Sequence, residues 1–487
     1  MRTLPPFLKI LPLIIVGILL GEAFQPSGWS VAIGATLCTL LALWLAKRKE
    51  GTLYIAAAIV LWALLTTTMR TPWSVPTPTV PEELPATITS YPTTSGRWQR
   101  CEGEIVTQGR RRDIIIQADT SIYITIGQQG TLYGYLNPLP EGSYGELMSR
   151  RGFVGQVWLT SRGDWLPEEE QITSIRIAGR KAQRALVERI ERLGLDSDAE
   201  GVVEAMLTGW RGGLTPALRE SYSLAGSSHL LAISGLHIGL VAMLVWWLCW
   251  LLPALSRRGH IVRNITAALI MILYAYLTGL SPSALRATLM FCTAQLALAY
   301  GTPKSALNLL TGAATVMLLA NPNNLFDISF LLSFAAVVGI AIGFAPLMEL
   351  FGASRGPRWL RGLCGVVVVG LCSTIATLPL VSHTFGVVSL VGIFLNPLVI
   401  LTAEIIVLLG FIWVTLPLDI LHPVMSGLIG GAAELQNRLV EGAARLPWAA
   451  WQMEMPTWMV ALCYTLMAVG LTVSLLWKEK RVWKPGK

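Results

Sequence analysis

The chain has 487 residues, of which 53% are hydrophobic and 14% charged, and its formal net charge is +8. Its mean hydropathy is +0.58, and several apolar runs approach the ~20 residues that cross a bilayer. This composition excludes an ordinary soluble enzyme and predicts a polytopic α-helical membrane protein.

Three apolar segments open the chain, at residues 7–24, 31–46 and 52–69. The first lacks a cleavage site, which is typical of a signal anchor. The basic loop Lys47-Arg48-Lys49 indicates a cytoplasmic connection between the second and third segments. Residues 1–70 are therefore predicted to form a three-helix membrane segment with a cytoplasmic N-terminus and an outer end.

Residues 71–178 predict an extracytoplasmic β-domain. Five short strands, at 101–107, 113–118, 121–126, 131–136 and 153–159, are separated by turn signals, and a short helix at 144–151 precedes the last strand. Such a series fits an inserted OB-like β-barrel domain. A proline-rich linker enters the domain, with Pro72, Pro76, Pro78, Pro81 and Pro85.

Residues 179–226 predict amphipathic connector helices, because apolar side chains recur at helical spacing between arginines and glutamates. Residues 227–477 form a second membrane block, which brings the total to about 10–12 spans. The basic tail, residues 478–487, is predicted to be cytoplasmic, as is the loop Ser256-Arg-Arg-Gly259. The spans expected in this block are 229–252, 265–280, 285–300, 307–319, 328–350, 366–380, 387–416, 420–440 and 459–477.

The segment Ser227-Ser-His-Leu-Leu-Ala-Ile-Ser-Gly-Leu-His-Ile-Gly239 puts two imidazoles and a Ser-Gly pair at the outer end of a span. Lipid-facing helices avoid such groups, so a site that holds them lines water or packs against protein. A plain helix N-terminus with a serine cap explains the same pattern. Spacing alone leaves both interpretations open.

Further polar side chains interrupt the second block. A charge at mid-bilayer costs roughly 2.5–3.5 kcal/mol, so each one must snorkel, pair or face an aqueous cavity. A structural role explains any single residue, but their recurrence favours a polar cavity or channel. The residues are Arg286, Asp327, Ser333, His383 and Asn396.

Residues 205–219 and 225–239, followed in order by 279–290, 327–336 and 378–389, resemble the signature of the ComEC competence membrane proteins. These proteins are the DNA-uptake channels of the inner (cytoplasmic) membrane in naturally transformable bacteria. The resemblance implies that single-stranded DNA passes from the outer face to the cytoplasm. The basic loops and tail independently predict a multi-pass protein with both termini cytoplasmic.

Two groups of residues would meet DNA under this interpretation. The entrance candidates lie on the β-domain: Arg97, Arg100, Arg110, Arg111 and Arg112. Neighbouring carboxylates dilute that patch, so a merely solvated loop explains Arg110–Arg112 equally well. The pathway candidates are His229, Ser234, Gly235, His237, Arg211, Arg286, Asp327, Ser333, His383 and Asn396.

The chain departs from the family pattern in two places. Trp210 stands where many members have an aspartate, and residues after Trp477 do not resemble the metallo-β-lactamase-like domain that many members carry. No HxHxDH pattern occurs, so we expect no metal, no cofactor and no catalytic residue. The expected partners are single-stranded DNA, membrane lipid, a DNA receptor, a cytoplasmic motor and a separate nuclease; a homo-oligomer is left open.

Two other function classes stay open. The first is a transporter or scaffold for another envelope polymer. The second is an intramembrane serine hydrolase with Ser234 as nucleophile and an imidazole as base. His237 is poorly placed for that role only three residues away, so His383 would have to supply the base.

Overall fold

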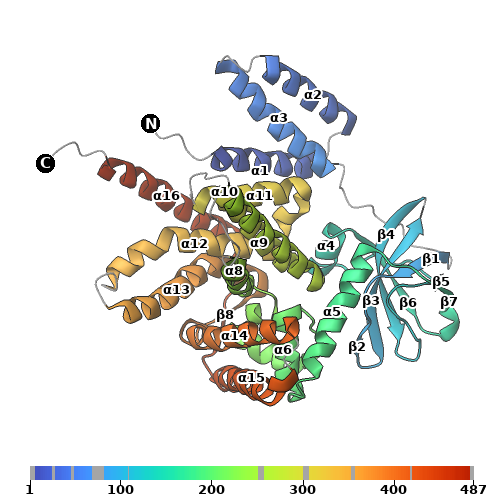
Figure 1. Cartoon of the computed structure of the whole chain (residues 1–487). Helices are drawn as coiled ribbons and strands as arrows, with labels where there is room; N and C mark the ends of the chain where they lie inside the picture. Colours follow the sequence, from blue (N-terminus) through green and yellow to red (C-terminus); the bar gives the residue numbers. More distant parts are fainter. Residues whose placement is uncertain are drawn as a thin grey trace. The chain divides into compact units, whose positions relative to one another are not determined.

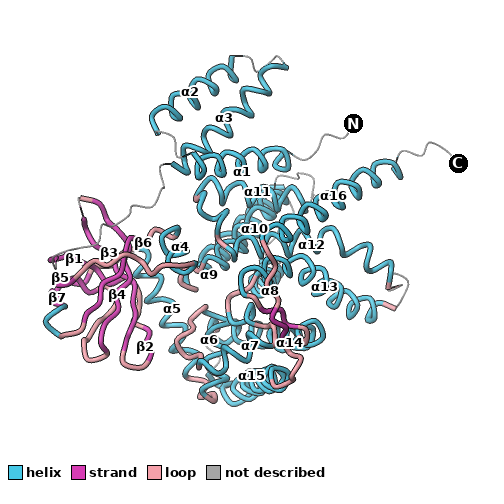
Figure 2. Tube along the Cα trace, turned by 180° about the vertical axis from the view of Figure 1, so that it is seen from behind, coloured by secondary structure: helices cyan, strands magenta, loops and turns pink. Residues whose placement is uncertain are grey.

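The computed structural model describes residues 6–24, 28–44, 49–68, 82–107, 109–249, 257–299, 306–351, 357–416 and 419–482. Helices predominate, and seven strands gather in one β-domain (Figures 1 and 2). The chain divides into two compact units. Unit 1 comprises Met1–Arg189, Ala268–Thr293 and Thr311–Asp327, and unit 2 comprises Ile190–Ala267, Ala294–Leu310 and Ile328–Lys487.

Unit 1 begins with α1 (Pro6–Phe24), α2 (Gly28–Trp44) and α3 (Lys49–Thr68), which match the three predicted spans. Two glycines one turn apart let α1 approach α3 closely. A Cβ at Gly17 would collide with the carbonyl oxygen of Val60, and one at Gly21 would lie 2.9 Å from Cβ of Thr67. Small residues at this spacing favour close packing of membrane helices.

The β-domain follows as β1 (Glu82–Ile88), β2 (Thr93–Ser95), β3 (Trp98–Thr107), β4 (Arg110–Asp119), β5 (Gln128–Gly134), β6 (Phe153–Leu159) and β7 (Trp165–Gln171). The sheet order is β6-β4-β3-β1-β5-β7, with β2 paired to β3. All pairs are antiparallel except β4 with β6, which α4 (Ser143–Arg150) helps to connect. The OB type of this sheet stays a prediction.

Three of the β-domain predictions need correction. Residues 121–126 form no strand, although Ile122, Ile124 and Ile126 are buried. These residues form a turn-rich loop whose isoleucines pack against the core. The alternation in the sequence comes from this packing and not from strand pairing. Strands β1 and β7 were not predicted. Pro85 was assigned to the linker but lies in β1, where it pairs with β5 one residue before β1 also joins β3. The other linker prolines lie outside the described residues.

The rest of unit 1 packs a helical turn against α5 (Ile175–Glu191). The turn joins α9 (Arg257–Leu277) to α10 (Pro282–Ala299) and places Gly279 at φ +72°. A Cβ there would lie 2.5 Å from Oε1 of the buried Gln183, whose Nε2 donates to the carbonyl oxygen of Thr278 at 3.4 Å. The unit ends with α11 (Ala306–Ala320) and the short helix η3 (Pro322–Phe326).

Unit 2 is helical apart from the antiparallel pair of β8 (Val387–Ser389) and β9 (Ala450–Gln452), which α14 (Gly392–Thr415) and α15 (His422–Ala444) separate in the chain. Two expected spans begin late: the short helix η2 (Ser228–Leu231) and a break at residues 232–234 precede α8 (Gly235–Cys249), and residues 387–391 are extended or irregular before α14. The other helices are α6 (Ser197–Thr208), α7 (Pro216–Leu224), α12 (Ile328–Leu350), α13 (Arg358–Phe385) and α16 (Thr457–Val482).

Five helices within the described residues are long and apolar enough to cross a membrane. They are Phe7–Phe24, Gly259–Leu277, Ile328–Leu350, Cys364–Phe385 and Gly392–Thr415, and shorter apolar helices accompany them. The prediction of a polytopic helical membrane protein with an inserted β-domain is therefore confirmed. The total of about 10–12 spans remains a prediction.

A buried polar quartet joins three helices of unit 2. The hydroxyl of Tyr222 in α7 donates to Oδ1 of Asn437 and accepts from Nε2 of Gln436, both at 2.9 Å. Oε1 of Gln436 accepts from Thr402 of α14 at 3.0 Å. These side chains satisfy one another where water is absent, which fixes the register of α7, α14 and α15.

We predict that Tyr222→Phe destabilises the protein by about 1–3 kcal/mol, because it leaves two buried amides short of a partner. Thermal denaturation of the purified full-length protein in detergent measures the effect. Tyr123→Phe is the matched control, since Tyr123 is 79% exposed. Equal melting temperatures for the two variants would contradict the prediction.

Candidate functional site

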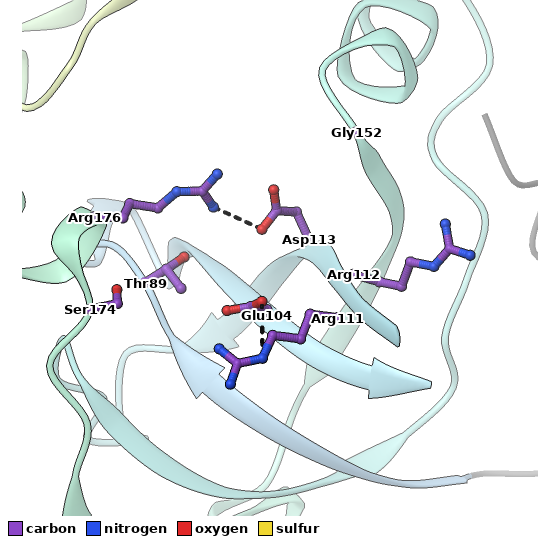
Figure 3. A pocket seen from close by; sticks show the side chains of 8 residues that line it. All are labelled: Thr89, Glu104, Arg111, Arg112, Asp113, Gly152, Ser174 and Arg176. Carbon is purple, nitrogen blue, oxygen red and sulfur yellow. Dashed lines mark hydrogen bonds and ion pairs between the residues drawn. The ribbon is translucent and has the colours of Figure 1, made fainter. Parts of the chain in front are cut away.

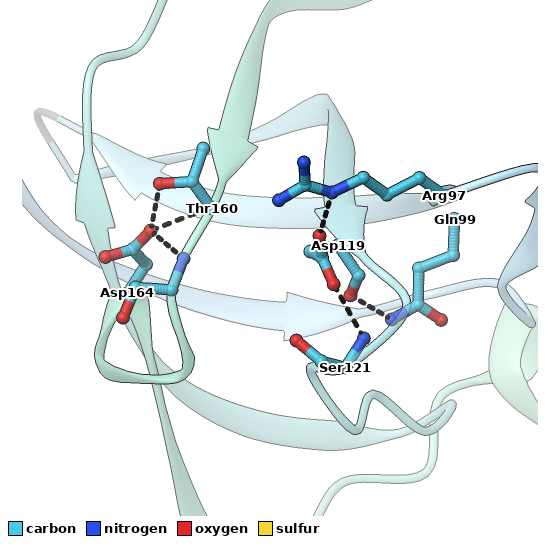
Figure 4. A network of polar contacts seen from close by, with 7 residues as sticks. Arg97, Gln99, Asp119, Ser121, Thr160 and Asp164 are labelled. Carbon is cyan, nitrogen blue, oxygen red and sulfur yellow. Dashed lines mark hydrogen bonds and ion pairs between the residues drawn. The ribbon is translucent and has the colours of Figure 1, made fainter.

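Three of the predicted entrance arginines make specific contacts within the β-domain. Nε of Arg97 donates to Oδ2 of Asp119 at 2.7 Å (Figure 4). The Arg100 guanidinium lies 5.2 Å from the ring centroid of Tyr144, and Nε of Arg111 lies 3.9 Å from Oε1 of Glu104. Carboxylates thus pair with part of the patch, as the sequence suggested they would.

Asp119 anchors the loop that follows β4. The hydrogen bond from Arg97, followed by that from the backbone N–H of Ser121, lowers the pKa of Asp119 to about 2. Gln99 donates to the carbonyl oxygens of Asp119 and Ile122, which holds the same loop against the core. The contact of Arg97 is therefore at least partly structural.

The remaining arginines border a polar pocket of about 360 Å³ on the β-domain (Figure 3). Arg176 of α5 points to Asp113, with Nη1 2.8 Å from Oδ1, whereas Arg112 extends away from the Glu104–Arg111 pair. Three arginines and two carboxylates line the pocket, so cationic groups are in excess. Arg110 is exposed beside it. Such a surface attracts anions such as phosphates.

Three charged residues come together elsewhere in unit 1, and we call them the charged triad: Arg151, Arg286 and Asp327. Arg286 of α10 is 5% exposed, and the charges that act on it are those of Asp327 and Arg151. Asp327 follows η3 and accepts a hydrogen bond from Nη2 of Arg151 at 3.4 Å. Because Arg151 directly follows α4, the β-domain supplies one of the two cations.

Arg150, the neighbour of the triad, fastens α4 to two other elements of unit 1. Its Nη2 donates to Oε1 of Glu22 in α1 at 2.9 Å, and its guanidinium lies 4.2 Å from the ring centroid of Phe326. Its carbonyl oxygen accepts from Nδ2 of Asn323 in η3 at 2.9 Å. The triad is thus held by a rigid frame of cation–π, ionic and hydrogen-bond contacts.

The signature segment of unit 2 packs tightly before α8 starts. Gly226 has φ +72°, and a Cβ there would lie 2.6 Å from Cβ of Ser389. The hydroxyl of the buried Ser227 donates to Oδ1 of Asn396 at 2.9 Å. Nε of Arg211 donates to the carbonyl oxygen of Leu231 at 3.1 Å. Asn396 and Arg211 therefore help to shape the segment, whatever else they contact.

The two signature histidines differ in environment. His229 is exposed in the short helix η2 (Ser228–Leu231), whereas His237 is 0% exposed in the first turn of α8. Neither ring nitrogen of His237 has a hydrogen-bond partner in the described part of the chain. The hydroxyl of Ser234 accepts from the backbone N–H of His237 at 3.1 Å, which is an N-cap contact.

The other pathway candidates are more scattered. No described atom lies within 4 Å of a Cβ built at Gly235 or Gly239, so these two glycines make no close approach to another described segment. Ser333 donates to the carbonyl oxygen of Ser329, and Nδ1 of His383 lies 2.8 Å from the carbonyl oxygen of Met455. His383 is exposed, and among the described residues its hydrogen bond is to Met455 and not to Ser234.

Two features were missed by the sequence reasoning. Arg150 and Arg151 were not singled out, because their polar helix carries no motif. Glu404 lies at the middle of α14, with Oε1 buried and unpartnered in the part of the chain that is described. A carboxylate in the centre of an apolar span is itself a signal of function. The described residues hold no group of three or more ligands able to bind a metal ion.

The fold and these residues define a polytopic membrane protein with an inserted β-domain and ionisable side chains among apolar helices. A family model described as "Competence protein" matches residues 206–479, more than half of the chain. The chain belongs to this competence protein family, which confirms the resemblance drawn from its signature segments. The β-domain lies outside the matched residues.

Two curated relatives align with the chain. ComE operon protein 3 of Bacillus subtilis (strain 168) is 29% identical over 209 residues, which cover 42% of this chain and 25% of that protein. Competence protein ComA of Neisseria gonorrhoeae is 26% identical over 323 residues, 62% of this chain and 45% of that protein. The chain thus spans less than half the length of either relative. No solved structure matches it significantly.

We predict that the loop after β4 loosens in acid. Because folding lowers the pKa of Asp119, its carboxylate stabilises the fold at any pH above the pKa of an unfolded aspartate, ~4. This contribution is lost as the pH falls toward 2, where the carboxylate becomes protonated in the folded protein. Pepsin should therefore cleave residues 119–127 of the full-length protein faster at pH ~2 than at pH ~4, relative to other sites. Asp119→Asn should raise cleavage at pH ~4 and abolish the difference. Equal, pH-independent cleavage of both proteins would contradict this account.

Proposed function

We propose that this protein forms the inner-membrane channel through which single-stranded DNA enters the cytoplasm during natural transformation. Its family membership and the names of its relatives, a competence protein and a product of a competence operon, support a role in competence. The N- and C-termini lie in the cytoplasm under this proposal, and the β-domain faces outward.

The charged triad is the observation that carries the proposal. A strand of DNA carries one negative charge per nucleotide, so its route needs protein-lined polar surface with cationic groups. The triad places two arginines and one aspartate beside apolar helices, which leaves a net positive charge. The arginine-lined pocket of the β-domain offers a second surface for phosphates, suited to the entrance.

The chain itself is proposed to be a conduit and not an enzyme. A receptor that delivers DNA, a cytoplasmic motor and a nuclease that degrades the other strand would be separate proteins. Ser234 supports this assignment, because its hydroxyl accepts from the backbone of α8 as a helix cap does. Passage of a different envelope polymer is the outcome to expect if DNA uptake does not depend on this protein.

We predict that Arg286→Ala lowers uptake of labelled DNA into the cytoplasm by about tenfold or more, because the charged triad loses the buried cation that would attract the phosphates. Uptake is measured in a transformable strain whose own copy is deleted, and immunoblots of membranes measure accumulation. Arg438→Ala is the matched control, since this arginine is 80% exposed and pairs along its own helix with Glu434.

A charge-swapped variant separates conduction from folding. Arg286→Asp combined with Asp327→Arg preserves the opposite charges but moves the cation. If phosphates need the cation on α10, the swap accumulates normally and still fails in uptake. Normal uptake in the deletion strain or in the swap would contradict the proposal. Loss of accumulation in Arg286→Ala, with normal accumulation and normal uptake in the swap, would assign the pair to folding alone.

A second prediction concerns the buried imidazole of unit 2. His237→Phe replaces two unpartnered nitrogens with apolar atoms of similar shape, so stability should stay within about 1 kcal/mol of the wild type or rise. Uptake should nevertheless fall if the imidazole serves the DNA route. Thermal denaturation and DNA uptake of the same variant give the answer, and unchanged uptake would remove His237 from the pathway.

A further inference from the structure

A cationic cluster that has no acidic partner among the described residues joins the end of α8 to the start of α9 in unit 2. The Arg263 guanidinium lies 5.7 Å from the ring centroid of Trp246, which is in the last turn of α8. Nη2 of Arg263 lies 3.2 Å from Nδ1 of His260, one turn earlier in α9. Because arginine only donates, Nδ1 accepts, and the neutral His260 ring carries its proton on Nε2.

Two buried donors of this cluster have no acceptor. Arg263 is 9% exposed, yet its Nε has no hydrogen-bond partner, and the indole N–H of Trp246 also lacks one in the described part of the chain. No aspartate or glutamate occurs anywhere between Glu220 and Asp327. A buried cation with unsatisfied donors is costly unless a ligand supplies the acceptors.

The surface around the cluster shows which acceptor fits. Trp247 and Leu248 on α8 are 60% and 47% exposed, and Val262 and Ile265 on α9 are 57% and 40% exposed. Helix α9 contains a candidate membrane span that starts at Gly259, so Arg263 lies within one turn of its end. Donors at the membrane boundary, flanked by apolar side chains, suit a molecule with an anionic head and hydrocarbon tails.

We propose that Trp246, His260 and Arg263 bind the phosphate headgroup of an anionic phospholipid. The planar guanidinium and the indole N–H donate to phosphate oxygens, and the acyl chains lie along the exposed apolar side chains of α8 and α9. The preceding loop, Ser256-Arg-Arg-Gly259, is predicted to be cytoplasmic, and anionic lipids are concentrated in the cytoplasmic leaflet. Basic pockets between membrane helices on that side hold such headgroups.

A phosphate of DNA shares this chemistry but fits the site less well. A strand in transit needs a water-lined route, whereas this cluster borders apolar side chains that water would not favour. Only one phosphate could reach the three donors, so a polyanion would gain little there. The proposal does not depend on the cargo that the protein moves.

The test uses the full-length protein in a neutral detergent, titrated with phosphatidylglycerol or phosphatidylcholine. Native mass spectrometry measures the affinity for the first lipid retained. The wild type should retain phosphatidylglycerol in preference to phosphatidylcholine. Arg263→Gln should weaken that affinity by about tenfold, as expected when a charge-assisted contact is lost. Arg438→Gln, which removes an exposed arginine of the same unit, should leave it unchanged.

Trp246→Phe keeps an aromatic ring beside Arg263 and removes the indole N–H together with the pyrrole portion of the ring, so it should weaken retention by a few-fold while the protein still accumulates. This variant also tests the proposed lipid site if Arg263→Gln fails to accumulate. Equal retention in Trp246→Phe and the wild type would overturn the proposal, as would equal effects of Arg263→Gln and Arg438→Gln. Displacement of phosphatidylglycerol by micromolar inorganic phosphate or a single-stranded oligodeoxynucleotide would overturn the lipid as the natural occupant.

Discussion

The structure depends on one constraint: a charge buried among apolar helices must find its partner within the protein. Arg286 lies in a stretch of 106 residues that contains no acid, and the negative charge that acts on it is that of Asp327, directly after that stretch. Asp327 in turn contacts Arg151. The need to neutralise one membrane arginine therefore ties α10, η3 and α4 of the β-domain together.

The same constraint separates structural from functional polar groups. Tyr222, Gln436 and Asn437 are buried and hydrogen-bond to one another, so a structural role, fixing the register of their helices, accounts for them. His237, Glu404 and Arg263 each bury a polar atom that has no hydrogen-bond partner within the described residues. Such atoms cost free energy of about 1–3 kcal/mol each, which selection tolerates only where a ligand, a proton or water compensates. His237, Glu404 and Arg263 are therefore candidates for a functional role.

Much of the fold follows from the sequence because apolar length and helix pattern are local properties. The three N-terminal spans and α12 lie where the runs of apolar residues predict them. Residues 121–126 mislead because burial of Ile122 and Ile124 imitates the alternation of a strand. Pro85 was assigned to the linker because proline has no backbone N–H to donate within a sheet. A strand tolerates proline only where that N–H is not needed for pairing, and the pairing register is known only from the structure.

The site was harder to predict than the fold, because it depends on contacts between distant segments. The sequence identified Arg286 and Asp327 as anomalies, 41 positions apart, but gave no reason to pair them with Arg151 or with each other. The sequence does not distinguish the exposed from the buried histidine of the signature. That the ring nitrogens of His237 have no hydrogen-bond partner among the described residues depends on how the helices pack. Arg263 was not singled out from the sequence, because its contact with Trp246 joins side chains of two different helices.

The most direct test of the central claim, that DNA passes beside the charged triad, is site-specific photo-crosslinking during uptake. A photoreactive residue at position 283 lies one turn from Arg286 on the same side of α10. One at position 285 lies on another side of the helix, where Leu285 is 44% exposed and Arg286 is 5% exposed. The account predicts that position 283 captures the incoming labelled strand and position 285 does not. Equal capture at both positions, or none at either while uptake proceeds, would contradict it.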